Sequence, residues 1–344
     1  MTSQGARRLR GLLVALALGA GPTPGASAQW LDKQGPVRAV IEENDLLVRT
    51  DRHYTQGTKV SSLSADDALP DWLASLSKTL PRIGMGDSGP NKYGFELGQS
   101  IFTPANLKAT QLLKDDRPYA GWLYTGMILQ RRGMLGEWPV LENFQVELGV
   151  IGPHSLAEET QTAVHEFRGF DIPQGWRNQL HDEPGLALKY QRSWLFSPST
   201  SGPRWVDLIP QAGLSVGNVE TSFRAGAMVR FGINLPNDFG VATITSVGTT
   251  EGGWSEKRST GRYGFYVFGA AESSTVLYTV FLDGNTFRSS PSIDKRTLVA
   301  EARYGAVLVL NRVELALTYV FRTPEFVGQT KDDAYGSLML KIKY

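Results

Sequence analysis

The chain of 344 residues contains no cysteine. Disulfide frameworks, thiol nucleophiles and cysteine-based metal sites are therefore excluded, and histidine and oxygen ligands are left to carry any site chemistry. An excess of charge of one sign is also lacking, since 35 Lys and Arg stand against 34 Asp and Glu. A chain without a strong net field has no general attraction to nucleic acid, so no nucleic-acid partner is expected.

Long hydrophobic runs are missing as well. The apolar run at residues 11–20 (GLLVALALGA) falls short of the roughly 18 residues that a membrane-spanning helix needs. It follows three arginines and precedes the small-residue sequence Ala26-Ser27-Ala28. This arrangement predicts a secretory signal peptide over residues 1–28, which leaves residues 29–344 as the exported protein.

Alternation of apolar and polar side chains dominates the exported part. In the last ten residues one face carries Leu338, Leu340, Ile342 and Tyr344, and the other carries Ser337, Met339, Lys341 and Lys343. A soluble β-sandwich shows the same alternation. The chain, however, ends on an aromatic residue of an amphipathic strand, and aromatic residues gather near strand ends, which favours a transmembrane barrel. The expected interfacial girdle contains Trp122, Tyr124, Trp194, Phe196, Tyr319 and Phe321.

Twelve segments are typical of strands, and they predict a single all-β domain over residues 29–344. The expected fold is a closed transmembrane antiparallel β-barrel in the bacterial outer membrane, with short helical segments in its loops. The segments are 37–47, 55–64, 92–102, 119–131, 140–151, 185–196, 204–217, 219–233, 261–283, 297–310, 312–322 and 335–344. Segment 261–283 is kept as one long strand because single-chain bacterial barrels have even strand numbers.

The connection 65–91 is long for a periplasmic turn. Its stretch Trp72-Leu73-Ala74-Ser75-Leu76 predicts a small amphipathic helix at the membrane surface, in an insertion to which the sequence assigns no function.

Strand parity places three other connections, 44–55, 103–118 and 152–184, together on the outer rim. They hold most polar motifs that carry chemistry, and all four histidines, His53, His154, His165 and His181, are expected on this rim.

The polar motifs of the first connection have structural interpretations beside functional ones. Asn44-Asp45 at a strand end is ordinary turn chemistry. Thr55-Gln56-Gly57 alone is typical of a strand start with a bulge glycine.

The third connection contains a segment, 158–167, that is expected to form a helix with Gln161 and His165 one turn apart on the same face. A lone helical histidine is usually a packing or surface residue. The nearby Asp171 makes His165 a candidate general base for attack of water on an ester.

A serine triad is weakly supported, because no Gly-x-Ser-x-Gly elbow is present. Water activated by histidine beside a hard cation requires carboxylate and carbonyl oxygens, which this chain supplies. Such ligands favour calcium over zinc. Asn44, Asp45, Thr55 and the backbone near Gly57 are candidates for the cage.

Several motifs occur together and in order along the exported chain. They are Glu43-Asn44-Asp45, Thr55-x-Gly57, Gln99-Ser100-Ile101-Phe102-Thr103-Pro104, Asp116-Arg117-Pro118-Tyr119-Ala120-Gly121, Gly149-Val150-Ile151-Gly152-Pro153 and Gln161-x-x-x-His165. In this combination the sequence resembles the LpxR-type lipid A 3′-O-deacylases. The resemblance implies a twelve-stranded outer-membrane barrel with a calcium-dependent site between the barrel wall and the outer loops. It also implies removal of the 3′-linked acyloxyacyl chain from lipid A of lipopolysaccharide in the outer leaflet, by a protein expected to be a monomer.

By position, the resemblance makes His165 the general base, Asn44 and Asp45 the pair near the metal, and Thr55 the site hydroxyl. The full set of expected metal ligands is Asn44, Asp45, Thr55, Gly57, Gln161 and Asp171. Asp171 stands where the family can have Glu, one methylene longer. Lys108, with Arg117 as second choice, is the expected contact for the phosphate and sugar of lipid A.

Two other functions remain open at this point. An outer-membrane phospholipase would release fatty acid from glycerophospholipids, and a small porin-like barrel would conduct ions without any dependence on a metal.

Overall fold

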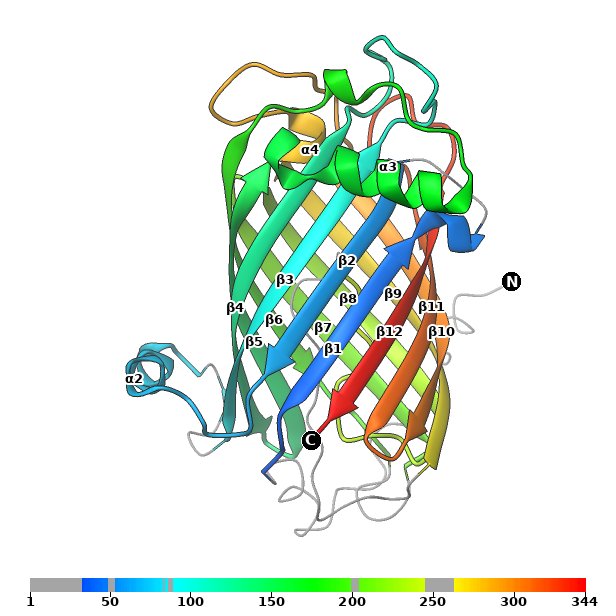
Figure 1. Cartoon of the computed structure of the whole chain (residues 1–344). Coiled ribbons are helices and arrows are strands. Elements are labelled where there is room, and N and C mark those ends of the chain that lie inside the picture. The colour runs from blue at the N-terminus through cyan, green and yellow to red at the C-terminus, as the bar shows by residue number, and fades with distance from the viewer. Residues whose placement is uncertain (1–32, 49–52, 83, 86–88, 199–203, 245–262) are drawn as a thin grey trace, which may run out of the picture.

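The computed structural model describes residues 33–48, 53–82, 84–85, 89–198, 204–244 and 263–344. The predicted signal peptide lies outside them. Within the described residues, twelve strands form one closed antiparallel barrel, in which sequence neighbours pair and β1 closes on β12 (Figure 1). The strands are β1 (Val37–Asn44), β2 (His53–Leu63), β3 (Asn91–Thr103), β4 (Ala120–Leu135), β5 (Trp138–Ile151), β6 (Glu183–Trp194), β7 (Val206–Gly217), β8 (Glu220–Ile233), β9 (Tyr263–Thr279), β10 (Leu298–Leu310), β11 (Val313–Arg322) and β12 (Asp333–Lys343). The predicted fold class and strand number are confirmed.

Two predicted strands end earlier than expected. β1 ends at Asn44, and Asp45–Val48 forms a 3-10 turn, η2. β9 ends at Thr279 instead of continuing to residue 283, because Val280–Asp283 forms the short helix α4. The Thr279 amide donates to the Asp283 carboxylate at 2.8 Å, and Phe281 stacks on Phe102 from β3 with ring centroids 4.2 Å apart. The prediction of one strand over 261–283 is therefore wrong at its end, since α4 turns inward and covers the top of the lumen.

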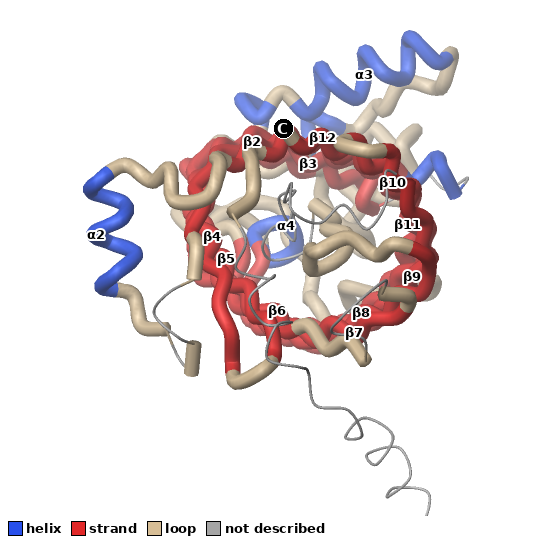
Figure 2. Tube along the Cα trace, turned by 90° about the horizontal axis from the view of Figure 1, so that it is seen from below, coloured by secondary structure: helices blue, strands red, loops and turns tan. Residues whose placement is uncertain are grey.

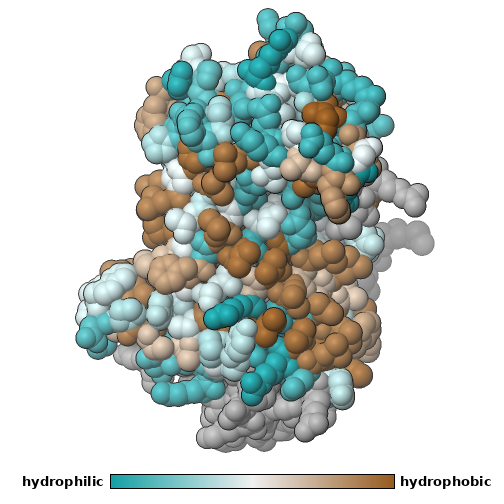
Figure 3. All heavy atoms as spheres, viewed as in Figure 1, coloured by the Kyte–Doolittle hydropathy of each residue, from teal (hydrophilic) through white to brown (hydrophobic). Residues whose placement is uncertain are grey.

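The outer surface of the wall is apolar, as a lipid-facing barrel requires. Figure 3 shows hydrophobic side chains gathered over the strands below a mostly hydrophilic rim. Tyr304 stacks with both Tyr319 and Phe321 on this outer surface, which confirms that part of the aromatic girdle. The prediction was wrong for Trp122 and Tyr124, which are buried and line the lumen.

The lumen is filled by the described start of the connection from β8 to β9, residues 235–244. This segment enters from the periplasmic end, where β8 stops, and lies inside the strand ring seen in Figure 2. Asp238 is held by Arg230 at 2.5 Å and by Lys341 at 3.3 Å. Further up, the Ile244 amide donates to the buried Glu43 carboxylate at 2.8 Å. A lumen occupied in this way does not favour the channel alternative.

Two longer helices lie outside the ring, α2 (Asp71–Thr79) in the β2–β3 connection and α3 (Ala157–Arg168) in the β5–β6 connection. Both predicted helices are thereby confirmed. α3 begins after the 3-10 turn η3 (Pro153–Ser155) and ends at Gly169, whose φ of +70° gives a left-handed C-cap. A second 3-10 turn, η4 (Trp176–Asn178), follows. No helix in the described ranges has the length and apolarity to cross a membrane.

Candidate active site beneath an outer helix

The start of α3 packs against the outside of the barrel wall. Ala157 joins a buried cluster with Ile101 from β3, and Gln99 donates to the Ser155 carbonyl at 2.7 Å. Phe95 and Leu97 of β3 are exposed to lipid, so Gln99, Ile101 and Thr103 share their outward face. Gly121 of β4 provides the room, because a Cβ there would overlap the Ser155 hydroxyl and Ala157.

One face of α3 looks toward the wall and carries the two predicted polar residues. Ala157, Gln161 and His165 are its buried side chains. The indole of Trp176 in η4 donates to the Gln161 amide oxygen at 2.9 Å. The His165 Nδ1 lies 2.7 Å from the backbone carbonyl oxygen of Asp171. A carbonyl only accepts, so Nδ1 carries a hydrogen, and in the neutral form of the ring the lone pair is then on Nε2.

The wall beneath this helix presents its own polar side chains outward. Thr55 sits at a register irregularity of β2, and its hydroxyl lies 2.7 Å from that of Thr103 on β3. On β1 the exposed Val40 defines the outward face, which Glu42 and Asn44 share. Thr103 stands in one of the sequence motifs but is not among the predicted site residues, although strand alternation and its place beside the start of β2 indicate it.

The far end of α3 reaches toward β1. The Arg168 guanidinium attracts the Glu42 carboxylate, which faces outward one pleat below Asn44. Asp45 follows Asn44 directly and is buried in η2, which packs on β12 and β2. α3, which carries Gln161 and His165, crosses the outer ends of the strands (Figure 1). Asn44, Asp45 and Thr55 lie at the outer ends of β1 and β2, so the structure brings these elements to one outer region.

Lys108 and Asp171 form an exposed ion pair at the edge of this region, with Nζ and the carboxylate 2.6 Å apart. The pairing raises the pKa of Lys108 and lowers that of Asp171. Asp171 thus engages Lys108 with its side chain, and its backbone carbonyl accepts from the His165 ring. This arrangement does not support Asp171 as a metal ligand.

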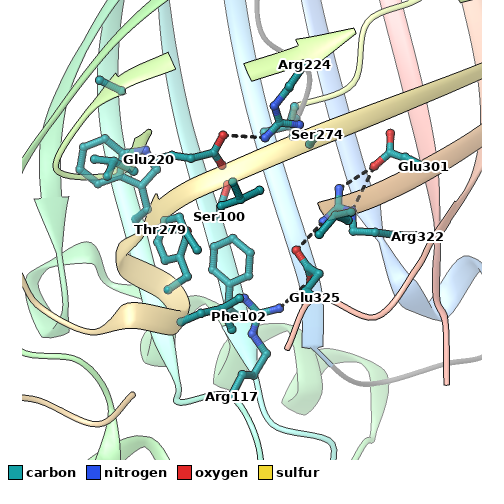
Figure 4. A pocket seen from close by; sticks show the side chains of 18 of the residues that line it. Ser100, Phe102, Arg117, Glu220, Arg224, Ser274, Thr279, Glu301, Arg322 and Glu325 are labelled. Atoms are coloured by element: carbon teal, nitrogen blue, oxygen red, sulfur yellow. Dashed lines mark hydrogen bonds and ion pairs between the residues drawn. The ribbon is translucent and has the colours of Figure 1, made fainter. Parts of the chain in front are cut away.

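Two other predicted residues have lumen contacts. A Cβ on Gly57 would overlap the Tyr54 hydroxyl inside the lumen, so a side chain at this position would point inward, and the expected backbone donor near Gly57 stays a prediction. Arg117 is only 1% exposed and lines a lumen cavity of about 110 Å³. It pairs with Glu325 at 3.1 Å, and its guanidinium lies over Phe102 (Figure 4). The prediction of Arg117 as a rim contact for substrate is wrong, because its charge is already neutralised within the barrel.

The predicted rim location of the histidines is confirmed, but they do not form one site. His53 is buried at the start of β2, with Nδ1 2.7 Å from Asp333 and Nε2 3.4 Å from Asp116. Burial raises the pKa of Asp116, but the hydrogen bonds from His53 and the amides of Ala105 and Arg117 outweigh it, and the net effect lowers the pKa. The cluster clamps the outer connection 103–118 to the barrel.

The oxygen donors of the outer region have the chemistry of a hard-cation site. They are the amide of Asn44, the buried carboxylate of Asp45 and the hydroxyl of Thr55. In the part of the chain that the structure describes, no group of three or more His, Cys, Asp and Glu side chains is placed to hold a metal ion. The three donors fit calcium better than zinc, since calcium accepts amides, hydroxyls and water beside a carboxylate.

A family model described as outer membrane protein LpxR matches residues 12–344. The chain belongs to the LpxR family. The resemblance drawn from the motifs is thereby confirmed, with the outer membrane as the location, and membership supports an outer-membrane lipid A deacylase.

Among solved structures, LpxR from Salmonella typhimurium aligns with a TM-score of 0.67 and 20% identity, covering 90% of this chain and all of that one. The β domain of the Bordetella autotransporter BrkA aligns with a TM-score of 0.40 and 9% identity, covering 90% and 99% of the two chains. No curated protein sequence matches the chain. The LpxR structure thus shares the barrel fold described above.

Proposed function

We propose that this LpxR-family barrel hydrolyses the ester of the 3′-linked acyl or acyloxyacyl chain of lipid A, with His165 as general base. One observation carries the proposal. His165 faces the wall from α3, and the Asp171 carbonyl holds it in the tautomer whose Nε2 can take a proton from water.

The surrounding side chains position this base. The bond between Trp176 and Gln161 fixes α3 one turn before His165, and the contact between Ser155 and Gln99 fixes the start of the helix. Water that gives its proton to Nε2 attacks the ester carbonyl carbon, and the leaving alkoxide of the sugar then regains a proton.

Calcium is the proposed cofactor. Asn44, Asp45 and Thr55 would hold it, with Asp45 providing the charge. When bound, such an ion polarises the ester carbonyl and stabilises the negative charge that develops on its oxygen.

The substrate is proposed to be lipopolysaccharide of the outer leaflet, approaching from the side. Its acyl chains would stay against the apolar outer wall of β3, where Phe95 and Leu97 are exposed. The exposed Lys108 at the edge of the region is the candidate contact for a lipid A phosphate. The whole site is built from one chain, which is consistent with a monomer.

The experiment compares lipid A from cells that express wild type, His165→Ala or His154→Ala, by mass spectrometry. His154 is the matched control, because it lies exposed on the same rim and pairs with Asp182 at 2.7 Å. We expect His165→Ala to lose about 100-fold or more in deacylation rate. His154→Ala should keep the wild-type rate, and a calcium chelator should reduce it.

A folded His165→Ala protein that works at the wild-type rate would contradict the proposed base. Fatty acid release from glycerophospholipid vesicles without lipopolysaccharide would identify a phospholipase instead.

A further inference from the structure

The helix α2 lies across the barrel axis. The length of the connection between β2 and β3 does not by itself require this orientation. The helix lies outside the wall at the periplasmic end, seen nearly end-on in Figure 1 and lengthwise from below in Figure 2. Its axis therefore runs across the barrel axis, parallel to the plane of the membrane. This is the orientation of amphipathic helices that rest in a lipid interface.

A buried arginine of the barrel wall holds α2 in place. Arg131 of β4 donates from Nη1 to the carbonyls of Ser77 at 3.1 Å and Leu80 at 3.0 Å, and from Nη2 to Pro81 at 2.8 Å. Its Nη2 also pairs with Glu142 at 2.8 Å. These bonds satisfy carbonyls at the helix C-terminus, which have no partner within the helix. The depth of α2 relative to the strands is thereby fixed.

That depth coincides with a belt of aromatic side chains on the lipid-facing surface. Leu148 of β5 is exposed to lipid, so Phe144 and Glu142 share its outward face. Phe144 packs on Tyr190 of β6, with ring centroids 4.9 Å apart, and also lies under the Arg131 guanidinium. Aromatic belts of this kind mark the interface between lipid and water.

The exposed surface of α2 is divided between apolar and polar side chains. Leu73 and Ser77 are buried against the protein. Trp72 is 59% exposed and Leu76 44% exposed, and a spacing of four residues places them side by side on one flank. Asp71, Ser75 and Lys78 occupy the surface that faces away from both.

We propose that α2 is an interfacial anchor helix that inserts Trp72 and Leu76 into the periplasmic leaflet of the outer membrane. The partner is phospholipid at the boundary of glycerol and acyl chains, while Ser75 and Lys78 stay among headgroups and water. Tryptophan favours this boundary, and the lipid-facing wall of β3 and β4 continues directly into it. This anchor helix fixes how deeply the barrel sits in the membrane, and therefore the position of the opposite rim relative to the lipid. This role is independent of the proposed enzymatic activity.

The absence of cysteine makes the test direct, because one introduced cysteine carries the only label. Full-length exported chains with Leu76→Cys or Ser75→Cys are labelled with a polarity-sensitive fluorophore and folded into phospholipid vesicles. Ser75 is the matched control, being exposed on the neighbouring polar surface of the same turn. Phospholipids with brominated acyl chains should quench the label at position 76 several-fold more than at 75, and aqueous iodide should show the reverse order.

Equal quenching at the two positions, or stronger iodide quenching at position 76, would overturn the proposal. The same holds if the label at 76 is exposed to water in pure lipid and becomes protected only in native outer membranes, because a protein partner would then cover this flank. Trp72→Ala combined with Leu76→Ala provides a second readout. Its unfolding in detergent should match wild type, whereas its insertion into vesicles should be several-fold slower, and equal insertion rates would also overturn the proposal.

Discussion

The buried carboxylate of Glu43 supports the candidate site from inside the barrel, and this support is open to measurement. Glu43 lies next to Asn44 and accepts the Tyr54 hydroxyl at 2.8 Å, while Tyr54 lies next to Thr55. Its second oxygen accepts the Ile244 amide from the lumen segment. One fully buried side chain therefore joins β1, β2 and the lumen segment directly behind the outward-facing donors.

Tyr54→Phe removes a single hydrogen bond to this carboxylate and leaves the packing of the ring intact. Removing the donor leaves a buried acceptor with one partner fewer, which costs about 1–3 kcal/mol. We expect the free energy of unfolding to fall by that amount, measured by urea titration of the barrel folded in vesicles. Deacylation should fall as well, because the ends of β1 and β2 lose a common support.

Tyr304→Phe is the control, since this tyrosine faces lipid and is half exposed. Its effect should stay within about 0.5 kcal/mol. If the two variants unfold at the same urea concentration, Glu43 and Tyr54 are not a structural support of the site, and the reasoning is refuted.

Two further predictions concern the outer connections. The lowered pKa of Asp116 means that its ionised form stabilises the fold at pH values above its ordinary pKa of 3.8, and that this contribution is lost as pH falls through the lower folded value. Connection 103–118 should therefore become sensitive to pepsin only below about pH 4 in wild type, but already at higher pH in Asp116→Asn; identical profiles would contradict this. Gly121→Ala should displace the start of α3 and abolish most deacylation while the barrel stays folded on heat-modifiability gels. Gly269→Ala, where a Cβ meets nothing within 4 Å, should be fully active, and equal activity of both variants would exclude the close approach.

Strand number, membrane class and the rim location of the polar motifs were predictable from sequence. A strand has a period of two, so the face of each residue follows from its neighbours once one lipid-facing residue is known. The predicted girdle residues Trp122 and Tyr124 instead lie on the inward face of β4. The predicted end of β9 was also wrong, because the apolar residues of α4 have a pattern that is compatible with a longer strand.

The candidate site was predictable only in part. Gln161 and His165 share a helical face by spacing alone, and Asn44 lies at a strand end. Arg117 was the second choice for a rim cation after Lys108, but its actual partner, Glu325, is about 200 positions away in the chain and only tertiary structure brings the two together.

The sequence by itself determined an outer-membrane barrel of twelve strands whose polar motifs meet at the outer rim, because local periodicity and strand parity are properties of neighbouring residues. The tertiary structure decided which polar groups face α3 and which face the lumen, that the Asp171 carbonyl accepts from the His165 ring, and that Arg131 holds α2 at the aromatic belt. These depend on barrel closure and on contacts between distant segments. The alternation of faces along a strand does not determine where side chains in loops point. Which of their charges are paired depends on the buried contacts that the folded chain makes.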